Sequence, residues 1–240
     1  MPKKEKHTIS IIVPVLNEEQ WVGPFLRQLN SHLPQDNTTE ILVVDGGSSD
    51  KTVSKAKENG GKVVASTRGR AIQMNTGARM AKGDILYFLH VDTLPPPHFC
   101  QHITTAVRNG HQAGCFQMRF DSTSPFLRFF AWFTRFNWSV CRGGDQSLYV
   151  DKALFLRTGG YNEDYRIYED NELAARLGKL TRFKVLPQKV VTSARKYQLL
   201  GTWRLQYHFA RIHLKNYLGA GPEALYQYYQ KNIGAPSLKA

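Results

Sequence analysis

The chain has 240 residues, of which 42% are hydrophobic and 21% are charged. This length can bury a substantial core, and the composition excludes a disordered chain. The net charge of +13 comes mainly from residues 176–240, which hold 12 Lys and Arg against the single acid Glu223, whereas residues 1–175 hold 20 basic and 18 acidic residues. A basic end of this kind favours a phosphate-rich partner: a nucleic acid, an anionic membrane or a phosphorylated ligand.

The start of the chain and its cysteines indicate a cytoplasmic location. Residues 1–6 are basic, but the apolar run that follows has only the length of a strand, so we expect no secretory leader. No stretch reaches the roughly 18 to 20 apolar residues that a membrane-spanning helix needs. Cys100, Cys115 and Cys141 are odd in number and lack metal-site spacing, so we expect buried, reduced thiols.

Strand-like and helix-like segments alternate through the first 92 residues. Continuous apolar runs such as Ile9–Val15 are typical of strands that are buried on both faces. The expected order is strand 9–15, helix 18–33, strand 41–44, helix 51–59, strand 63–65, helix 69–81 and strand 85–89. This alternation predicts a parallel sheet with right-handed crossovers.

The second half of the chain is less regular. After the prolines at 95–97, the pattern predicts a helix over 98–109, strands over 113–120 and 146–150, a helix over most of 164–180, and helices over 199–218 and 222–233. Phe126–Trp138 contains seven aromatic residues, and Arg128 and Arg135 lie seven positions apart. This segment fits either a helix packed on the core or a helix at a membrane interface, and the basic, aromatic C-terminal residues favour the second.

Polar residues follow the first two expected strands. Asn17 and Glu18 come after the first strand and could equally begin a helix, whereas Asp45 follows four apolar residues of the second. Two adjacent strand ends with polar groups form a crevice that suits a base and a ribose. A carboxylate there can accept hydrogen bonds from a ribose hydroxyl or from an N–H group of the base. Asp50, further along, is expected to be a helix cap.

Two further clusters suit a diphosphate and a metal. Arg68 and Arg70 open an expected helix, whose first N–H groups favour anions, although a solvated basic loop is the alternative. His90 and Asp92 are two positions apart at a strand end and so are expected to point the same way. They could share a divalent cation, with Mn²⁺ closer than Mg²⁺ to what imidazole prefers, or His90 could be a structural histidine.

Glu169 and Asp170 begin another expected helix. Acids near a helix N-terminus are stabilised by the helix dipole, which is one explanation for this pair. A transferase also needs a carboxylate to take the proton of its acceptor, and this pair is the best candidate in the chain.

Taken in order, these segments resemble the family 2 glycosyltransferases over residues 8–195. Residues 43–50, VVDGGSSD, match the family's V-D-D-G-S-x-D segment with Gly46 in place of the second acid. Residues 89–92, LHVD, stand where the family has its D-x-D metal motif, and Glu169–Asp170 matches its E-D motif. The chain is most similar to short soluble members that carry Leu-His-x-Asp-Thr and Gly-Asp-Gln stretches.

The resemblance implies an α/β fold of the GT-A type, with a mostly parallel central sheet flanked by helices. It divides the chain into a nucleotide-binding half over 8–93, an acceptor half over 94–195 and a basic, aromatic helical tail over 196–240. It also implies inverting transfer of a sugar from a nucleoside diphosphate sugar, most simply a UDP-sugar, to a hydroxyl of a lipid or small-molecule acceptor, with Mn²⁺ or Mg²⁺ as the cofactor.

The same resemblance implies a role for each motif. Asp170 is the general base, with Glu169 beside it, and Asp92 holds the metal, with His90 as a possible second ligand. Binding roles fall to a larger set. The nucleoside is expected at Pro14, Val15, Asn17, Glu18 and Asp45, the diphosphate at Arg68, Arg70, Asp92 and Arg195, and the donor sugar or acceptor at Gly144, Asp145 and Gln146.

Two other functions fit parts of the sequence. The basic tail could hold nucleic acid in a catalytically inactive nucleotide- or nucleic-acid-binding module, but no known nucleic-acid motif is present. A nucleotidyltransferase needs a glycine-rich basic segment directly after the first strand, where this chain has the acidic sequence Asn17-Glu18-Glu19. We therefore expect a cytoplasmic transferase, peripheral on the inner membrane face.

Overall fold

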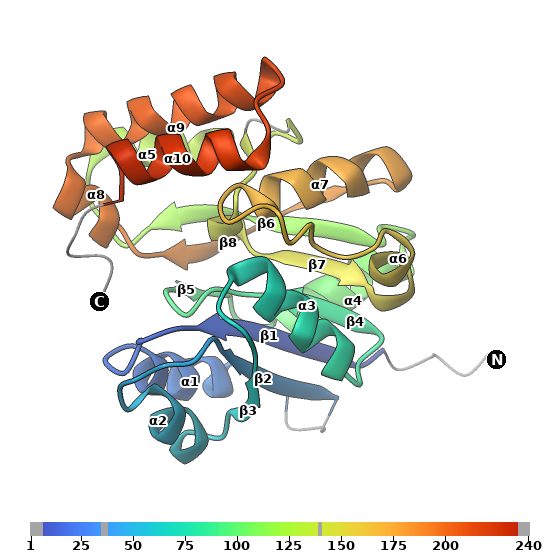
Figure 1. Ribbon diagram of the computed structural model, residues 1–240. Helices are drawn as coiled ribbons and strands as arrows, with labels where there is room; N and C mark the ends of the chain where they lie inside the picture. Colours follow the sequence, from blue (N-terminus) through green and yellow to red (C-terminus); the bar gives the residue numbers. More distant parts are fainter. Residues whose placement is uncertain (1–6, 35–37, 139–140, 235–240) are drawn as a thin grey trace.

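An eight-stranded sheet forms the centre of the protein (Figure 1). The computed structural model describes residues 7–34, 38–138 and 141–234. The strands run in the order β3-β2-β1-β4-β7-β6-β8-β5. Their bounds are β1 Ile9–Val15, β2 Thr39–Asp45, β3 Lys62–Ala65, β4 Ile85–Phe88, β5 Thr93–Leu94, β6 Ala113–Phe120, β7 Leu148–Asp151 and β8 Lys184–Thr192.

The parallel pairing predicted for the first 92 residues is confirmed, and with the parallel pair β6–β8 the sheet is mostly parallel, as expected. β1 pairs in parallel with β2 and β4, and β2 with β3. β7 is antiparallel to β4 and β6, and β5 is antiparallel to β8, so three of the seven strand pairs are antiparallel. The sheet is mixed because the strand–helix alternation that enforces parallel pairing ends with β4.

Helices cover both faces of this sheet. The hydrophobic side chains of α1, α2 and α4 pack on one face, and those of α3, α6 and α7 pack on the other. Successive residues of β1 alternate between the two faces, as the strand period requires: Ile11 and Val13 face the first layer and Ile12 the second. The bounds are α1 Val22–Ser31, α2 Thr52–Glu58, α3 Arg70–Met80, α4 Phe99–Arg108, α6 Lys152–Arg157 and α7 Glu169–Leu180.

Backbone geometry moves two helix boundaries from their expected positions. α7 begins at Glu169 and not near residue 164, because Tyr168 has a left-handed φ of 71° that ends any preceding helical path. The helix expected over 199–218 is divided at Gly201, whose φ is 83°, into α8 (Arg195–Leu200) and α9 (Thr202–Tyr217). The first of these boundaries places Glu169 and Asp170 on the first turn of α7.

The strand β8 was not expected from the sequence. Its register against β6 is interrupted between Phe116 and Gln117, opposite Pro187 and Gln188. Proline has no N–H to donate to the ladder, so a bulge at this point lets the strand continue past it. β8 ends at Thr192, three residues before Arg195.

The C-terminal helices pack together above the second half of the sheet, beside α5 (Pro125–Phe133) in Figure 1. Leu205 and Ile212 of α9 meet Leu225 of α10 (Pro222–Asn232) in a small core. Tyr165 and Tyr168, which precede α7, pack against this core. Within the described residues, no helix combines the length and the apolar character needed to cross a bilayer.

Candidate active site

Two pockets open next to each other at the carboxyl ends of β1 and β4. The polar pocket, about 740 Å³, is lined by residues 14–16 and Glu18, by residues 68–73 at the start of α3, and by Tyr165, Arg166 and Tyr226. The apolar pocket, about 620 Å³, lies between α5, the loop at 141–146 and the C-terminal helices. Arg70 and His90 line both pockets, so these two side chains mark their junction.

Asn17 and Asp45 hold two loops beside the polar pocket. Asn17 has a left-handed φ of 54°, its N–H donates to Ser48 Oγ at 2.9 Å, and its side-chain oxygen accepts from the Ser49 N–H at 2.9 Å. The Asp45 carboxylate accepts from the N–H groups of Gly47 and Ser48 at 3.1 Å. Neither Asn17 nor Asp45 is among the described residues that line the pocket, whereas Pro14, Val15 and Glu18 are.

The side chain of Gln73 links the carboxyl ends of β1 and β2 through hydrogen bonds that were not predicted from the sequence. Its buried side-chain N–H₂ donates to the carbonyls of Val15 at 2.9 Å and Val44 at 2.8 Å. A Cβ added at Gly46 would lie 3.0 Å from the Gln73 amide. The glycine that replaces an acid at position 46 therefore leaves room for this clamp.

Three arginines face the polar pocket. Arg68 and Arg70 open α3, as expected, and Arg166 is added from the loop before α7, where its guanidinium lies 4.8 Å from the ring centroid of Tyr226. Arg70 also makes an ion pair of 3.0 Å with Glu169, whose side chain is 1% exposed. The Glu169 carboxylate raises the pKa of Arg70, so Arg70 stays charged at the junction.

Glu18, Asp92 and Arg195 come together from three distant segments. Arg195 Nη2 lies 3.3 Å from Asp92 Oδ2 and 3.5 Å from Glu18 Oε1. The guanidinium also lies 5.2 Å from the ring centroid of Trp21. Burial raises the pKa of Glu18, and Arg195 opposes this shift. The sequence assigned Glu18 to the nucleoside and the other two residues to the diphosphate, and the structure brings all three side chains together.

The expectation that His90 and Asp92 point the same way from one strand is wrong. β4 ends at Phe88, and the following residues form a turn in which the Thr93 N–H donates to the His90 carbonyl at 3.1 Å. The His90 ring lies between two other acids, 3.8 Å from Asp170 and 4.0 Å from Asp145. Burial, with help from Arg70, lowers the pKa of His90 to about 4, so the ring is neutral at pH 7.

The residues around Asp92 fit a metal that takes only one or two ligands from the protein and the others from a bound substrate. The described part of the chain brings no three His, Cys, Asp or Glu side chains together in a metal-binding group. The Asp92 carboxylate is 25% exposed and already faces a cationic group, Arg195. Mg²⁺ in nucleotide sites commonly uses one or two carboxylates and takes its other ligands from phosphates and water. Asp92 meets this requirement, with His90 nearby.

Asp170, on the first turn of α7, lies close to the junction of the pockets, since its Oδ2 is 3.8 Å from the His90 ring. Tyr161 donates its hydroxyl to Asp170 Oδ1 at 3.2 Å. A Cβ added at Gly144 would overlap Asp170 Oδ2 and lie 2.6 Å from the His90 ring, so the glycine permits this close approach. Burial, reinforced by the charge of Glu169, raises the pKa of Asp170 to about 7. A carboxylate of this kind can accept a proton near neutral pH.

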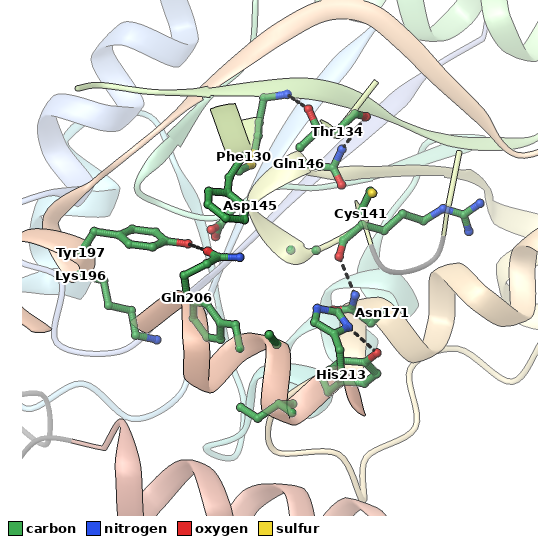
Figure 2. Close-up of a pocket in the computed structure, with 18 of the residues that line it drawn as sticks. Phe130, Thr134, Cys141, Asp145, Gln146, Asn171, Lys196, Tyr197, Gln206 and His213 are labelled. Atoms are coloured by element: carbon green, nitrogen blue, oxygen red, sulfur yellow. Dashed lines mark hydrogen bonds between the residues drawn. The ribbon is translucent and has the colours of Figure 1, made fainter. Parts of the chain in front are cut away.

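The loop at 143–146 lines the apolar pocket and lies against Asp170. Gly144, Asp145 and Gln146 form a 3-10 turn. Gln146 is buried, and its side-chain N–H₂ donates to the carbonyls of Phe116 and Thr134, each at 3.3 Å. Figure 2 shows Gln146 and Thr134 at one end of the pocket, with Tyr197 and His213 on opposite sides of it. Gln146 therefore fixes the pocket wall, and Asp145 lines the cavity.

A comparison with protein families identifies the family to which this chain belongs. The model of the family described as Glycosyl transferase family 2 matches residues 10–162, which is more than half of the chain. The chain belongs to this family. The match includes the pocket residues up to Gln146, whereas the pocket residues at 163–168, Asp170 and Arg195 lie beyond it.

Individual relatives of this family 2 chain agree with the assignment. The probable glycosyltransferase YdaM of Bacillus subtilis is 23% identical over 235 residues, which cover 87% of this chain and 56% of YdaM. The chain thus spans little more than half the length of this curated relative.

Solved structures establish the fold as α/β of the GT-A type. The mannosyltransferase PcManGT from Pyrobaculum calidifontis, in complex with GDP-Man and Mn²⁺, has a TM-score of 0.67 at 21% identity, over 94% of this chain and 70% of that chain. Residues 1–349 of TarS from S. aureus, in complex with UDP, have a TM-score of 0.64 at 18% identity, over 78% of this chain and 60% of that chain.

Proposed function

We propose that this family 2 chain transfers a sugar from a nucleoside diphosphate sugar, with UDP as the first candidate, to a hydroxyl of a lipid or small-molecule acceptor, with inversion of the anomeric carbon. The observation that carries the proposal is the meeting of two pockets at Arg70 and His90, next to the buried carboxyl of Asp170. One pocket has the charges that a diphosphate needs, and the other leads to the acceptor side of Asp170.

The donor nucleotide would occupy the polar pocket. Pro14 and Val15 would lie against the base, and Arg68 and Arg70, at the N-terminus of α3, would contact the diphosphate. Glu18 would contact the ribose, while Asn17 and Asp45 act through the loops that they hold together. The complexes of structural relatives with UDP and with GDP-Man support a nucleoside diphosphate as the ligand.

A divalent cation would be held by Asp92, with His90 as a possible second ligand and the remaining positions filled by diphosphate oxygens and water. When bound, such a cation neutralises the negative charge that develops on the departing diphosphate. Arg195, 3.3 Å from Asp92, would then contact a phosphate oxygen as a second source of positive charge.

The transfer itself needs one base. The Asp170 carboxylate would take the proton of the acceptor hydroxyl while that oxygen attacks the anomeric carbon. The bond from this carbon to the diphosphate breaks, and the electron pair leaves with the diphosphate. A single displacement of this kind inverts the anomeric centre. Glu169, held by Arg70 and buried, would position Arg70 and does not reach the acceptor.

The same proposal includes binding to the cytoplasmic face of an anionic membrane. Phe129 and Trp132 of α5 are 58% and 47% exposed, and Trp203 of α9 is 76% exposed. Phe126 joins the two helices, since its ring centroid lies 4.0 Å from that of Trp203. Exposed aromatics beside basic residues such as Arg204 suit a headgroup region.

Thermal stability in the presence of nucleotides tests the proposed donor. The chain would be heated with UDP, GDP, dTDP or CDP, each with and without Mn²⁺. We expect one nucleoside diphosphate to stabilise the fold, and more strongly with Mn²⁺. A ligand at about 100 times its dissociation constant adds about 2.7 kcal/mol to the free energy of unfolding, which is readily measured. If no nucleotide shifts the midpoint, the proposed donor site is wrong.

A further inference from the structure

The apolar pocket is far less polar than a site for a sugar or a small phosphorylated acceptor. Aromatic and aliphatic side chains from three separate parts of the fold form its walls: Phe120, Phe130, Phe133, Tyr197, Phe209 and Ile212. Its volume of about 620 Å³ lies within the usual range of about 300 to 1,000 Å³ for ligand sites. Phe129 lines the pocket and is also 58% exposed, so the apolar wall continues to the protein surface.

The cationic side chains that line this pocket already have partners. Lys196 donates to the Tyr229 hydroxyl at 2.8 Å and lies 5.5 Å from the ring centroid of Phe209. Arg142 donates to the Ala174 carbonyl at 2.9 Å, and Arg70 pairs with Glu169. Each of these cations therefore already has a polar partner among the described residues.

The remaining ionisable groups oppose a negative charge. Asp145 lines the pocket with a half-exposed carboxylate, and the His90 ring, which also lines it, lies 3.8 Å from Asp170. His213 bonds through Nδ1 to the Tyr168 hydroxyl at 2.8 Å, and burial lowers the pKa of its imidazole, so it adds no positive charge at neutral pH. A neutral apolar ligand meets no unfavourable charge here, whereas a phosphate or carboxylate would face Asp145.

We propose that the apolar pocket binds the body of an uncharged, apolar alcohol, whose hydroxyl reaches Asp170 at the junction of the two pockets. The proposal rests on the proposed transfer reaction for the role of that hydroxyl, but binding of the alcohol does not require the donor. Transfer of the apolar body from water into the pocket supplies most of the affinity, at roughly 25 cal/mol per Å² of apolar area removed from water. The acceptor is then a lipid-like or terpenoid alcohol.

Calorimetric titration of geraniol into the full chain, without nucleotide, tests this binding. Geraniol is an uncharged isoprenoid alcohol, and we expect it to bind with a negative heat-capacity change, the sign of apolar burial. Geranyl phosphate and glycerol are titrated in the same way. The first tests the effect of a charged head group, and the second tests the effect of removing the apolar body. Both should bind at least about tenfold more weakly than geraniol, a difference of about 1.4 kcal/mol.

A pair of variants locates the site. Ala210 lines the apolar pocket and Ala224 lines neither pocket, and both are exposed alanines on C-terminal helices. Ala210→Trp should fill the pocket and weaken geraniol binding at least tenfold, whereas Ala224→Trp should leave it within twofold. Ala210→Leu is a milder second variant in case the tryptophan disturbs α9. UDP affinity should stay within twofold in all three variants, because the polar pocket is untouched.

The results of the geraniol titrations can be distinguished from those of the nucleotide-binding test of the donor site. Geraniol binding that is lost in Ala210→Trp and kept in Ala224→Trp supports the proposal even if no nucleotide binds. Undetectable geraniol binding in a chain that binds UDP overturns it and leaves the proposed donor site intact. Equal binding by the two tryptophan variants, or tighter binding of geranyl phosphate than of geraniol, also contradicts it.

Discussion

The polar pocket is formed mainly by segments that are close together in the sequence, whereas the apolar pocket is formed by segments that are far apart. The polar pocket takes most of its lining from three short segments within the first 91 residues. The apolar pocket takes its lining from segments spread between Arg70 and Tyr229. Arg68 and Arg70 are therefore held by a local turn beside the parallel strands, whereas the apolar cavity requires distant elements to pack around it.

The two pockets also differ in the physics that would hold a ligand. Arg68, Arg70 and Arg166 face the polar pocket, so binding there should weaken as salt screens the charges. Aromatic rings line the apolar pocket, so binding there should depend on buried area and hardly on salt. At the junction, α10 serves both, since Tyr226 lines the polar pocket and Tyr229 the apolar one.

Removing the proposed base should have the largest effect. Asp170→Asn keeps the size of the side chain but cannot take a proton, so turnover should fall by about 10² to 10⁴. Turnover is measured as nucleoside diphosphate released from the nucleotide sugar that the stability assay selects. Asp164→Asn removes an exposed acid of the preceding loop and is the control. UDP affinity should change little in either variant, and normal turnover in Asp170→Asn would refute the assignment.

Crowding the junction should have the next largest effect. A methyl group at Gly144 would overlap Asp170 Oδ2 and press on the His90 ring, whereas one at Gly143 meets nothing within 4 Å. Gly144→Ala should therefore lower turnover by about 10- to 100-fold, since a displacement of about 1 Å can cost that much. Gly143→Ala should leave turnover nearly unchanged. Similar activities for the two variants would mean that the Gly144 approach is unimportant.

The pH dependence of turnover should show a smaller change. Burial raises the pKa of Asp170 to about 7, so the carboxyl is largely protonated, and inactive as a base, below that pH. Turnover should rise as the pH is increased from 6 to 8, by up to about tenfold for each pH unit below the pKa. The measurement is turnover at saturating donor across this range. A flat profile between pH 5 and 8 would place the pKa of the base elsewhere.

Membrane binding should give the smallest change. Arg204→Glu with Arg211→Glu reverses two exposed charges of α9, and each lost cation weakens binding to anionic vesicles by about 1 kcal/mol. Lys57→Glu with Arg79→Glu makes the same charge change on exposed positions of α2 and α3. Sedimentation with phosphatidylserine vesicles should distinguish the two pairs. Equal losses would indicate a net-charge effect without a specific face.

Some features of the two pockets could be predicted from the sequence. Buried apolar runs identify β1, β2 and β4, and the polar residues after them mark the end of the sheet where the pockets open. These features depend on short-range periodicity, which the sequence carries directly. The phosphate roles expected for Asp92 and Arg195 came from the family resemblance, and their contact with Glu18 was not predicted.

Other features depend on packing between distant residues, which the sequence pattern does not contain. Gln73 looks like an exposed helical residue until β1 and β2 bring two carbonyls to it. The direction of the His90 ring depends on a turn that ends β4 at Phe88, so strand alternation does not predict that the ring lies close to Asp170. Arg166 and Tyr226, 60 positions apart, meet only because α10 folds back over the loop before α7.

The most direct test of the donor site is a calorimetric titration of UDP, with Mn²⁺, into the native chain and two arginine variants. Arg68 faces the polar pocket, whereas Arg79 is an exposed arginine at the other end of the same helix region. We expect UDP to bind the native chain and Arg79→Ala alike. Arg68→Ala should bind at least about tenfold more weakly, because a hydrogen bond to a charged group contributes about 1.5 to 3 kcal/mol. Equal affinity in all three proteins, or no nucleotide binding to the native chain, would contradict the account.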